Sequence, residues 1–342
     1  MRILVIRTSA MGDVALTIPV IAAMREQHPD VGITLLTRKE FSHFFQASGN
    51  LHLFPADFNK RHKGIMGLIR MYQELMKTGK YDHVIDLHDV IRSMVLRVFF
   101  RLAGIPVSVI DKGRREKRAL IKGVYRRRLK HSTERYFDTF ARAGLLLEPT
   151  SGPWIIPDAG TQESMIEKTG FRPGINIGVA PFSKHSLKEW PIENLIALLN
   201  RISETSDAEF WLFGARSESG QLNELRQKVP GSHNIAGKLS LHEELALMAR
   251  LSFMISMDSS NMHMASLTGT KVVSIWGATD PTTGFGAWMQ PGEYSLCIPY
   301  EHLQCRPCTV YGKGKCRRKD HACMTWLTPE IVFQKISNLK IL

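Results

Sequence analysis

The residues best suited to chemistry in the first half of the chain lie in a polar segment at 8–13, directly after an apolar run at 2–7. A carboxylate at the end of a buried strand can accept the proton of a hydroxyl group, so Asp13 is our candidate for a general base. The alternative is structural, because an Asp at a helix start also accepts backbone N–H hydrogen bonds. This loop has no GxGxxG pattern, which argues against a dinucleotide site there.

Two lysines in the second half suggest an anionic ligand. Lys184 and Lys188 lie in the loop 181–191, which follows an apolar run at 176–180. A lysine at the end of a strand can neutralise a diphosphate leaving group as negative charge builds on it. The alternative is that both lysines are merely exposed to solvent.

The segment 257–265, MDSSNMHMA, combines small residues with the expected start of a helix. Small side chains let backbone N–H groups approach an anion, and a helix N-terminus adds partial positive charge. Ser259 and Ser260 are therefore candidates for contact with a diphosphate, and His263 for donation to a phosphate. Asp258 as a helix cap, and His263 as a structural histidine, are the alternatives.

A short turn at 277–281, GATDP, follows the next apolar run. Gly277 has no side chain and so permits a ligand to approach closely, and Thr279 offers a hydroxyl group. The alternative is a turn without a ligand.

Four cysteines near the C-terminus have the pattern C-x2-C-x7-C-x6-C, at Cys305, Cys308, Cys316 and Cys323. Four thiolates can bind zinc in a closed tetrahedral site, and lasting disulfides are rare in the cytoplasm. The sequence therefore allows a structural zinc without a part in the chemistry, or four reduced thiols that pack a loop.

The elements that position these residues alternate between strand and helix. Short apolar runs at 2–7, 33–36, 83–87 and 107–110, and again at 176–180, 209–213, 253–257 and 272–276, predict parallel strands. This alternation predicts two doubly wound, Rossmann-like α/β domains. We expect them to face each other across a cleft, where ligands bind at the carboxyl ends of the strands. We expect domains at 1–155 and 156–328, joined by a Pro- and Gly-rich linker, and a helix at 329–342 packing back toward the first domain.

The charge balance points to an anionic partner. The chain of 342 residues has a formal net charge of +13, concentrated in a basic run at 112–130 that suits an acidic lipid or phosphorylated glycolipid. No zinc-finger, helix-turn-helix or aromatic-rich sheet motif indicates nucleic acid. No apolar run is long enough to span a bilayer and the N-terminus does not read as a signal peptide, so we expect a cytoplasmic protein.

Several segments, in order, resemble the heptosyltransferases of glycosyltransferase family 9: RILVIRTSAMGDVALTIPVIAAMRE, YDHVIDLHDVIRS, SLKEWP, FGARSE and MDSSNMHMASLTGTKVVSIWGATDP. The resemblance implies a GT-B fold, an ADP-heptose donor, a metal-independent inverting transfer and a Kdo- or heptose-bearing lipid A acceptor. It places Asp13 at the general base, Lys188 at the donor lysine and Glu218 at the nucleoside contact. Ser260 stands where the family usually has Gly.

On this interpretation Asp13 and Lys188 are catalytic, and the donor is bound by Ser183, Lys184, Glu218, Asp258, Ser259, Ser260, His263, Gly277 and Thr279. The acceptor is bound by Lys60, Arg61, Lys63 and Arg92 at the inner face of the inner membrane, to which the enzyme attaches peripherally. No metal or other cofactor is required for catalysis. The alternatives are a nucleotide-sugar epimerase of the same architecture and a non-catalytic carbohydrate-binding protein.

Overall fold

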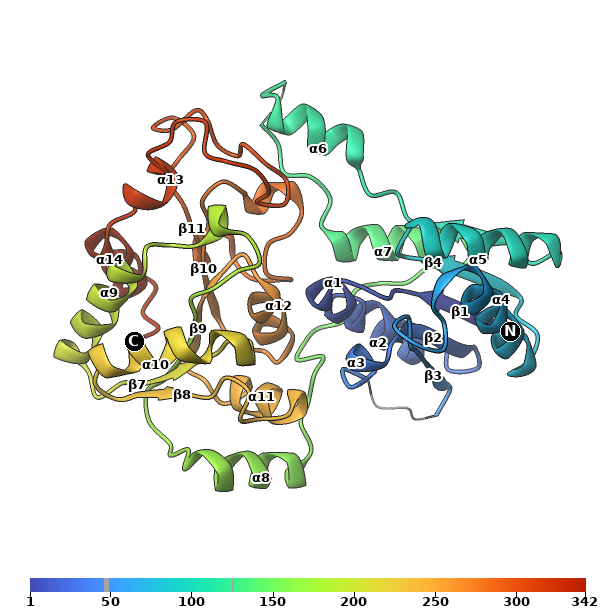
Figure 1. The fold of residues 1–342 in the computed structure, drawn as a ribbon, viewed down its shortest axis with the longest axis horizontal. Coiled ribbons are helices and arrows are strands. Elements are labelled where there is room, and N and C mark those ends of the chain that lie inside the picture. Colours follow the sequence, from blue (N-terminus) through green and yellow to red (C-terminus); the bar gives the residue numbers. More distant parts are fainter. Residues whose placement is uncertain (46–48, 125) are drawn as a thin grey trace. The chain divides into compact units, whose positions relative to one another are not determined.

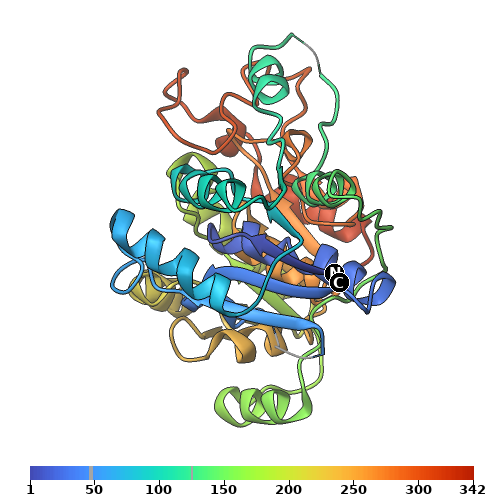
Figure 2. The same cartoon turned by 90° about the vertical axis from the view of Figure 1, so that its right-hand side faces the viewer.

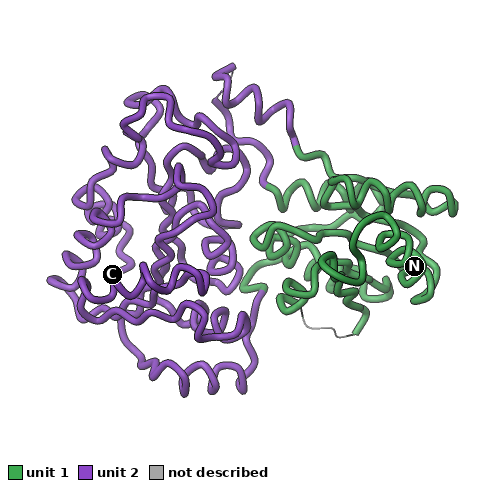
Figure 3. The backbone as a smooth tube through the Cα atoms, viewed as in Figure 1, with its two compact units in different colours: residues 1–112, 132–154 green, residues 113–131, 155–342 purple. Residues whose placement is uncertain are grey.

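The computed structural model describes residues 1–45, 49–124 and 126–342. These residues form two compact units, which Figure 3 colours separately. Unit 1 comprises Met1–Lys112 and Ser132–Trp154, and unit 2 comprises Gly113–His131 and Ile155–Leu342. The last passage from unit 1 to unit 2 therefore falls inside the Pro- and Gly-rich segment 147–160.

The sheet of unit 1 is parallel, with strand order β3-β2-β1-β4-β5 (Figure 1). Its strands are β1 (Arg2–Ile6), β2 (Gly32–Arg38), β3 (Leu51–Ala56), β4 (His83–Asp86) and β5 (Val107–Val109). The central strand β1 is apolar and almost wholly buried, as a parallel strand covered on both faces must be. The order reverses direction between β1 and β4, so the loops after these two strands lie at a switch point, where α/β folds bind ligands.

Helices cover both faces of this sheet. They are α1 (Met11–Ala15), α2 (Ile18–Gln27), α3 (Lys39–Ser42), α4 (Gly64–Lys77), α5 (Ile91–Leu102) and α7 (Ser132–Ala141). Figure 2 shows α4 and α5 on one side of the sheet and α7 on the other, where it contacts α2. Leu68 and Met71 of α4 and Phe100 of α5 pack on Leu4 and Ile6 of β1, so this face has one apolar core.

Unit 2 has a larger parallel sheet, with strand order β11-β10-β9-β6-β7-β8. Its strands are β6 (Asn176–Ala180), β7 (Glu209–Leu212), β8 (Ser232–Asn234), β9 (Phe253–Met257), β10 (Val272–Ile275) and β11 (Ser295–Leu296). The central strands β6, β9 and β10 are buried throughout. The loops that carry most of the candidate residues of this unit follow these three strands.

The helices of unit 2 are α6 (Arg114–Ile121), α8 (Ala159–Thr169), α9 (Ile192–Thr205), α10 (Ser219–Lys228), α11 (Leu241–Met248), α12 (Ser260–Leu267), α13 (Ala322–Thr325) and α14 (Pro329–Asn338). The C-terminal helix α14 packs on α9, and its expected packing toward the first domain stays a prediction. Its buried residues Val332 and Ile336 belong to the apolar core of unit 2. The apolar face of α14 is therefore part of the structure of unit 2 itself.

The basic segment Gly113–His131 also belongs to unit 2, although the expected first domain ran continuously from 1 to 155. The backbone N–H of Leu129 donates to the carbonyl oxygen of Thr282 at 2.8 Å, and His131 Nε2 lies 2.9 Å from the carbonyl oxygen of Gly286. Lys117 Nζ lies 4.0 Å from the ring centroid of Phe285. These contacts, none of which a local sequence pattern indicates, attach the segment to unit 2; Tyr125 lies outside the described residues.

Across residues 1–45, 49–124 and 126–342, no helix is long and apolar enough to cross a membrane.

Candidate functional site

Asp13 lies in the first turn of α1, after β1, and is held by a buried arginine. Arg7 NH2 lies 2.8 Å from Asp13 Oδ2, and the Arg7 side chain is nearly inaccessible while that of Asp13 is about one-third exposed, at 30%. Burial disfavours the charge of Arg7, but the neighbouring Asp13 raises the pKa of this guanidinium above its ordinary value. The Tyr136 hydroxyl donates to the backbone oxygen of Asp13 at 3.1 Å. The carboxylate is thus fixed at one oxygen and still partly open to solvent.

The helix-cap alternative for Asp13 is also present in the geometry. The backbone N–H of Ala10 donates to Asp13 Oδ2 at 3.4 Å, which is a long hydrogen bond beside the 2.8 Å ion pair. The ion pair with Arg7 is therefore the stronger constraint on this side chain, and a role as base is compatible with it.

His88 connects the loops that follow β1 and β4. Its Nδ1 lies 3.0 Å from Thr8 Oγ1 and its Nε2 lies 3.0 Å from Ser9 Oγ. Burial, together with the positive charges of Arg7 and Lys112, lowers the pKa of His88 to about 3. The imidazole is therefore neutral at physiological pH, and it positions the segment that leads into Asp13.

A second buried charge network lies beneath the loop after β4. Asp86 Oδ1 accepts hydrogen bonds from the backbone N–H groups of His88 and Asp89, at 2.8 and 3.0 Å. Arg97 NH1 lies 3.2 Å from both Asp86 Oδ2 and Asp89 Oδ1. Because unpaired buried charges are costly, this network holds the loop in one conformation.

In unit 2 the structure brings Lys188, Asp258 and Thr279 together from three loops. Lys188 Nζ lies 2.8 Å from Asp258 Oδ2, and the Thr279 hydroxyl donates to the same oxygen at 2.8 Å. Ser183 Oγ donates to the backbone oxygen of Asp258 at 3.1 Å. These residues follow β6, β9 and β10, which are neighbours in the sheet. Asp258 therefore orients the lysine ammonium, an arrangement able to present a positive charge to a phosphate.

The helix α12 begins beside this cluster. Ser259 is its N-cap residue and Ser260 its first residue, and Ser259 Oγ lies 3.2 Å from Ser256 Oγ. His263 is buried in the first turns of the same helix. The N-terminus of α12 thus adds backbone N–H groups and partial positive charge next to Lys188.

Three other candidates have structural contacts of their own. A Cβ atom at Gly277 would lie 2.6 Å from Met324 Cε, so packing against Met324 is enough to account for glycine at this position. Glu218 Oε2 accepts from the backbone N–H of Ala215 at 2.6 Å and closes the turn before α10. Lys184 is exposed. Their roles toward a donor remain predictions.

The four basic residues assigned to the acceptor lie in two neighbouring parts of unit 1. Lys60, Arg61 and Lys63 precede α4, and Arg92 lies in the first turn of α5. The guanidinium of Arg92 lies 4.9 Å from the ring centroid of Phe58, which joins the start of α5 to this loop. Arg61 already donates to Glu74 Oε1 at 2.9 and 2.6 Å. An anionic ligand of Arg61 must therefore compete with Glu74.

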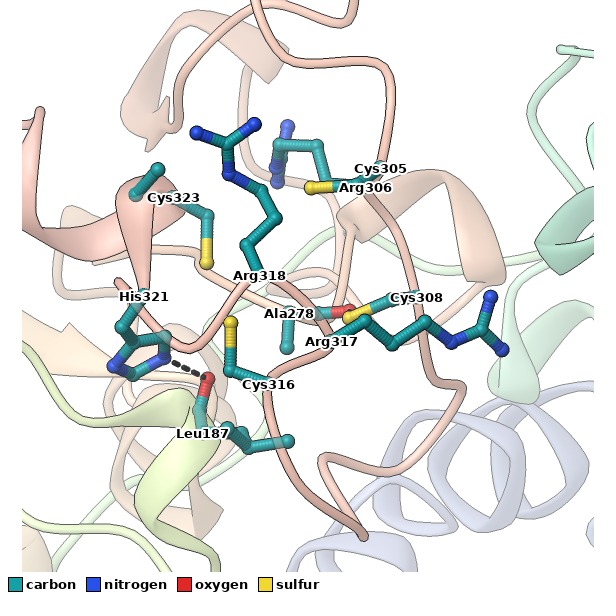
Figure 4. Close-up of a pocket in the computed structure, with 11 residues that line it drawn as sticks. Leu187, Ala278, Cys305, Arg306, Cys308, Cys316, Arg317, Arg318, His321 and Cys323 are labelled. Atoms are coloured by element: carbon teal, nitrogen blue, oxygen red, sulfur yellow. Dashed lines mark hydrogen bonds between the residues drawn. The ribbon is translucent and has the colours of Figure 1, made fainter.

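The four clustered cysteines line one pocket, together with Arg306, Arg318 and His321 (Figure 4). In Figure 4 their sulfur atoms are turned toward the same interior space. Burial, with the neighbouring Cys308 thiol, raises the pKa of Cys323 to about 12. Among the described residues, however, no group of three or more His, Cys, Asp or Glu side chains is arranged to hold a metal ion. The structure therefore has four free thiols in one pocket.

This cysteine-rich segment packs against the loop that carries Lys188. His321 Nε2 lies 3.3 Å from the carbonyl oxygen of Leu187, and a Cβ atom at Gly312 would lie 2.7 Å from Lys188 Cε. The backbone N–H of Cys308 donates to the carbonyl oxygen of Ala278 at 3.0 Å. The segment thus supports the aliphatic stem of the lysine.

Sequence reasoning missed Arg7, His88, Asp86, Arg97 and Tyr136, all buried in unit 1. Arg7 and His88 carry a usable signal, since a charged or polar residue that ends or directly follows an apolar run lies at the carboxyl end of a strand. Arg97 and Tyr136 carry no such signal, because their partners are 8 or more residues away.

Comparisons with known proteins find similar sequences. Residues 69–315 match the family model of glycosyltransferase family 9 (heptosyltransferase). The chain is 23% identical over 283 residues to the lipopolysaccharide core heptosyltransferase OpsX of Haemophilus influenzae, a match that covers 81% of this chain and 79% of that protein.

Solved structures share the fold. The family 9 glycosyltransferase of Veillonella parvula superposes with a TM-score of 0.78 at 19% identity, over 99% of this chain and 96% of that one. Escherichia coli heptosyltransferase WaaC with ADP-2-deoxy-2-fluoro heptose gives a TM-score of 0.68 at 19% identity, over 99% of this chain and 100% of the other. The two parallel α/β units therefore form the GT-B fold.

Proposed function

Because the chain belongs to glycosyltransferase family 9 (heptosyltransferase), we propose that this glycosyltransferase moves heptose from ADP-heptose to the inner core of lipopolysaccharide. The observation that carries the proposal is the Lys188–Asp258–Thr279 cluster beside the N-terminus of α12, which suits a diphosphate. The structure of the relative WaaC with an ADP-heptose analogue supports the choice of donor.

The donor diphosphate would bind at Lys188, Ser259 and Ser260 in unit 2. Negative charge grows on the diphosphate as the bond from the anomeric carbon to the phosphate oxygen breaks. The ammonium of Lys188 and the N-terminus of α12 stabilise that charge. Ser183, Lys184, Glu218, His263, Gly277 and Thr279 complete the proposed donor site, with Glu218 toward the nucleoside.

Asp13 is the proposed general base. Its carboxylate takes the proton of the acceptor hydroxyl as the hydroxyl oxygen attacks the anomeric carbon, and ADP leaves with the electron pair of the broken bond. Attack from the side opposite ADP inverts the anomeric carbon. The ion pair with Arg7 orients the carboxylate. A weak base is sufficient for this step because the hydroxyl becomes acidic only as the new bond forms.

The proposed acceptor is a Kdo- or heptose-bearing lipid A core. Lys60, Lys63 and Arg92 are exposed and offer charge-assisted hydrogen bonds to its phosphates and carboxylates, with Arg61 after release from Glu74. A lipid acceptor of this kind would place the enzyme on the inner face of the inner membrane.

For the four cysteines we propose one structural zinc, with no part in the chemistry. The shared pocket and the inward direction of the sulfur atoms in Figure 4 favour it. Since the thiols of the described residues are not arranged to hold a metal, binding would require them to move closer together around the ion. Elemental analysis of protein purified without chelator tests this: about one zinc per chain supports the site, and metal-free protein rejects it.

The test of the transfer reaction is mass spectrometry of purified core lipid after incubation with the enzyme and ADP-heptose. A mass increase of one heptose, with release of ADP, supports the proposal. Conversion of the nucleotide sugar without acceptor would indicate an epimerase, and binding without turnover of either substrate would indicate a carbohydrate-binding protein.

A further inference from the structure

The helix α5 of unit 1 is apolar on two opposite sides. Leu96 and Phe100 face the sheet and are buried, together with the polar Ser93 and Arg97. The side chains of Ile91, Met94, Val98 and Leu102 are exposed, and their spacing of three, four and four residues places them in one stripe along the other side. The most exposed, Ile91 and Leu102, are 79% and 81% accessible. A helix on the surface of a water-soluble domain normally carries polar residues on this side.

Positive charge borders this stripe. The helix contains Arg92 and Arg101 at its exposed margins and has no Asp or Glu. The adjacent helix α4 adds exposed Arg70 and Lys77. The nearby carboxylates already have cationic partners: Glu74 accepts from Arg61, and Asp89 from Arg97.

We propose that the outer side of α5 is a membrane-docking surface, at which the stripe Ile91, Met94, Val98 and Leu102 enters the interface of a bilayer rich in anionic phospholipid. Apolar side chains between basic residues are the pattern by which a helix lies in the plane of a membrane. Each arginine near an anionic surface adds attraction to the lipid headgroups.

Two observations favour a lipid surface over a second copy of the chain. A symmetric pairing of α5 with itself would bring the arginines of both copies together, which opposes association. The first turn of the helix also contains Arg92, one of the residues proposed to bind the acceptor. This second argument depends on the proposed function, because a lipid-anchored acceptor would then be presented at the end of the docking helix.

Co-sedimentation of the full chain with vesicles tests the proposal, without donor or acceptor. We expect binding to vesicles of phosphatidylethanolamine and phosphatidylglycerol, and much weaker binding to phosphatidylcholine. The double variant Ile91→Ser/Leu102→Ser should lower partitioning by about tenfold or more, since two large aliphatic side chains no longer insert. Arg101→Gln should lower it by about fivefold, and less at high salt.

The matched control is Leu146→Ser. Leu146 lies in unit 1 away from α5 and is 76% exposed, so its replacement should leave vesicle binding unchanged. Because all four substituted positions are exposed, thermal unfolding should be nearly unaltered in every variant. Wild-type binding by Ile91→Ser/Leu102→Ser would overturn the proposal. So would a dimer, seen by sedimentation velocity, that this variant dissociates while the wild type binds no vesicles.

A separate assay distinguishes this inference from the proposed function. With a core oligosaccharide released from its lipid, Ile91→Ser/Leu102→Ser should transfer heptose at the wild-type rate. If no variant and no wild-type protein transfers heptose, the proposed function fails while the vesicle result stands. If Ile91→Ser/Leu102→Ser alone failed to transfer heptose to the delipidated acceptor, the outer side of α5 would not be a surface that serves only for membrane binding.

Discussion

At the scale of single residues, Asp13 has two roles, one catalytic and one structural, and a substitution can distinguish them. It is the proposed base, and it is also the counter-ion of the buried Arg7. We expect Asp13→Asn to lower turnover by about 100-fold or more, because an amide cannot accept the proton. We also expect a lower melting temperature, because Arg7 keeps its charge in a buried place without a carboxylate.

Turnover and donor affinity measured on folded Asp13→Asn decide between the two tasks. Donor affinity should stay close to that of the wild type, since the proposed donor site lies in unit 2. The control is Asp82→Asn, an exposed carboxylate before β4. Turnover near the wild-type value in Asp13→Asn would remove Asp13 from the mechanism and leave only its structural role.

Lys188 is the second residue whose loss should be large. We expect Lys188→Ala to lower turnover by about 100-fold and to weaken the binding of ADP, because the positive charge held by Asp258 is lost. Calorimetric titration with ADP, alongside turnover, is the measurement. Thr279→Val removes the hydroxyl that donates to Asp258 but leaves the charge of Lys188 in place, so it should have a smaller effect. A change in acceptor affinity alone would show that the donor lies elsewhere.

At the scale of elements, the sequence predicted the central strands and the edge strand β5, but it missed the edge strands β3, β8 and β11. The strands β1, β6, β9 and β10 are continuous apolar runs, because parallel strands are buried on both faces. The edge strand β3 contains Pro55 and exposed His52, and the edge strands β8 and β11 are very short. Such strands form only because they pair with a neighbouring strand, and a local sequence pattern does not indicate this pairing.

In the candidate site, too, the sequence indicates some residues and not the contacts that orient them. Lys188, Asp258 and Thr279 were each noticed as residues at strand ends, and the parallel sheet brings them together. The contacts that orient Asp13, from Arg7 and Tyr136, depend on elements far apart in the chain. The position of the segment Gly113–His131 in unit 2 depends on contacts more than 100 residues away, which the expected domain boundary did not include.

His88, which connects the loops after β1 and β4, predicts that the stability of the folded chain depends on pH. His88 has a pKa of about 3 in the folded chain, below the ordinary value of about 6.5 for an unfolded chain. Between these values the unfolded chain binds the additional proton, so the contribution of His88 to folding is complete above about pH 6.5 and is lost as the pH falls. The expected slope is at most about 1.4 kcal/mol per pH unit.

Urea unfolding of the wild type and of His88→Gln isolates this effect. The pH should run from about 4, roughly 2.5 units below the ordinary histidine pKa, to about 7, roughly 0.5 unit above it. The difference in unfolding free energy between the two proteins should shrink as the pH falls. Other titrating groups, such as Glu244 with its pKa raised by burial to about 7, affect both proteins equally. A difference that does not vary with pH would contradict a neutral, buried His88.

At the scale of the whole molecule, the distribution of charge determines whether the reaction needs a metal. The chain carries a formal net charge of +13. In unit 2, Lys188 and the N-terminus of α12 are placed where a diphosphate would gain charge. Since these groups can supply the stabilisation that a divalent ion gives in other transferases, we expect activity to survive strong chelation.

The measurement is turnover with saturating donor before and after treatment with EDTA, with thermal unfolding followed on the same samples. Turnover should be unchanged. If the cysteine pocket holds zinc in the purified protein, its removal should lower the melting temperature of the protein and, because Gly312 and His321 pack on the Lys188 loop, weaken donor binding without abolishing the reaction. Complete loss of activity in EDTA, restored by magnesium rather than by zinc, would instead mean that a catalytic divalent ion shares the charge of the leaving diphosphate with Lys188.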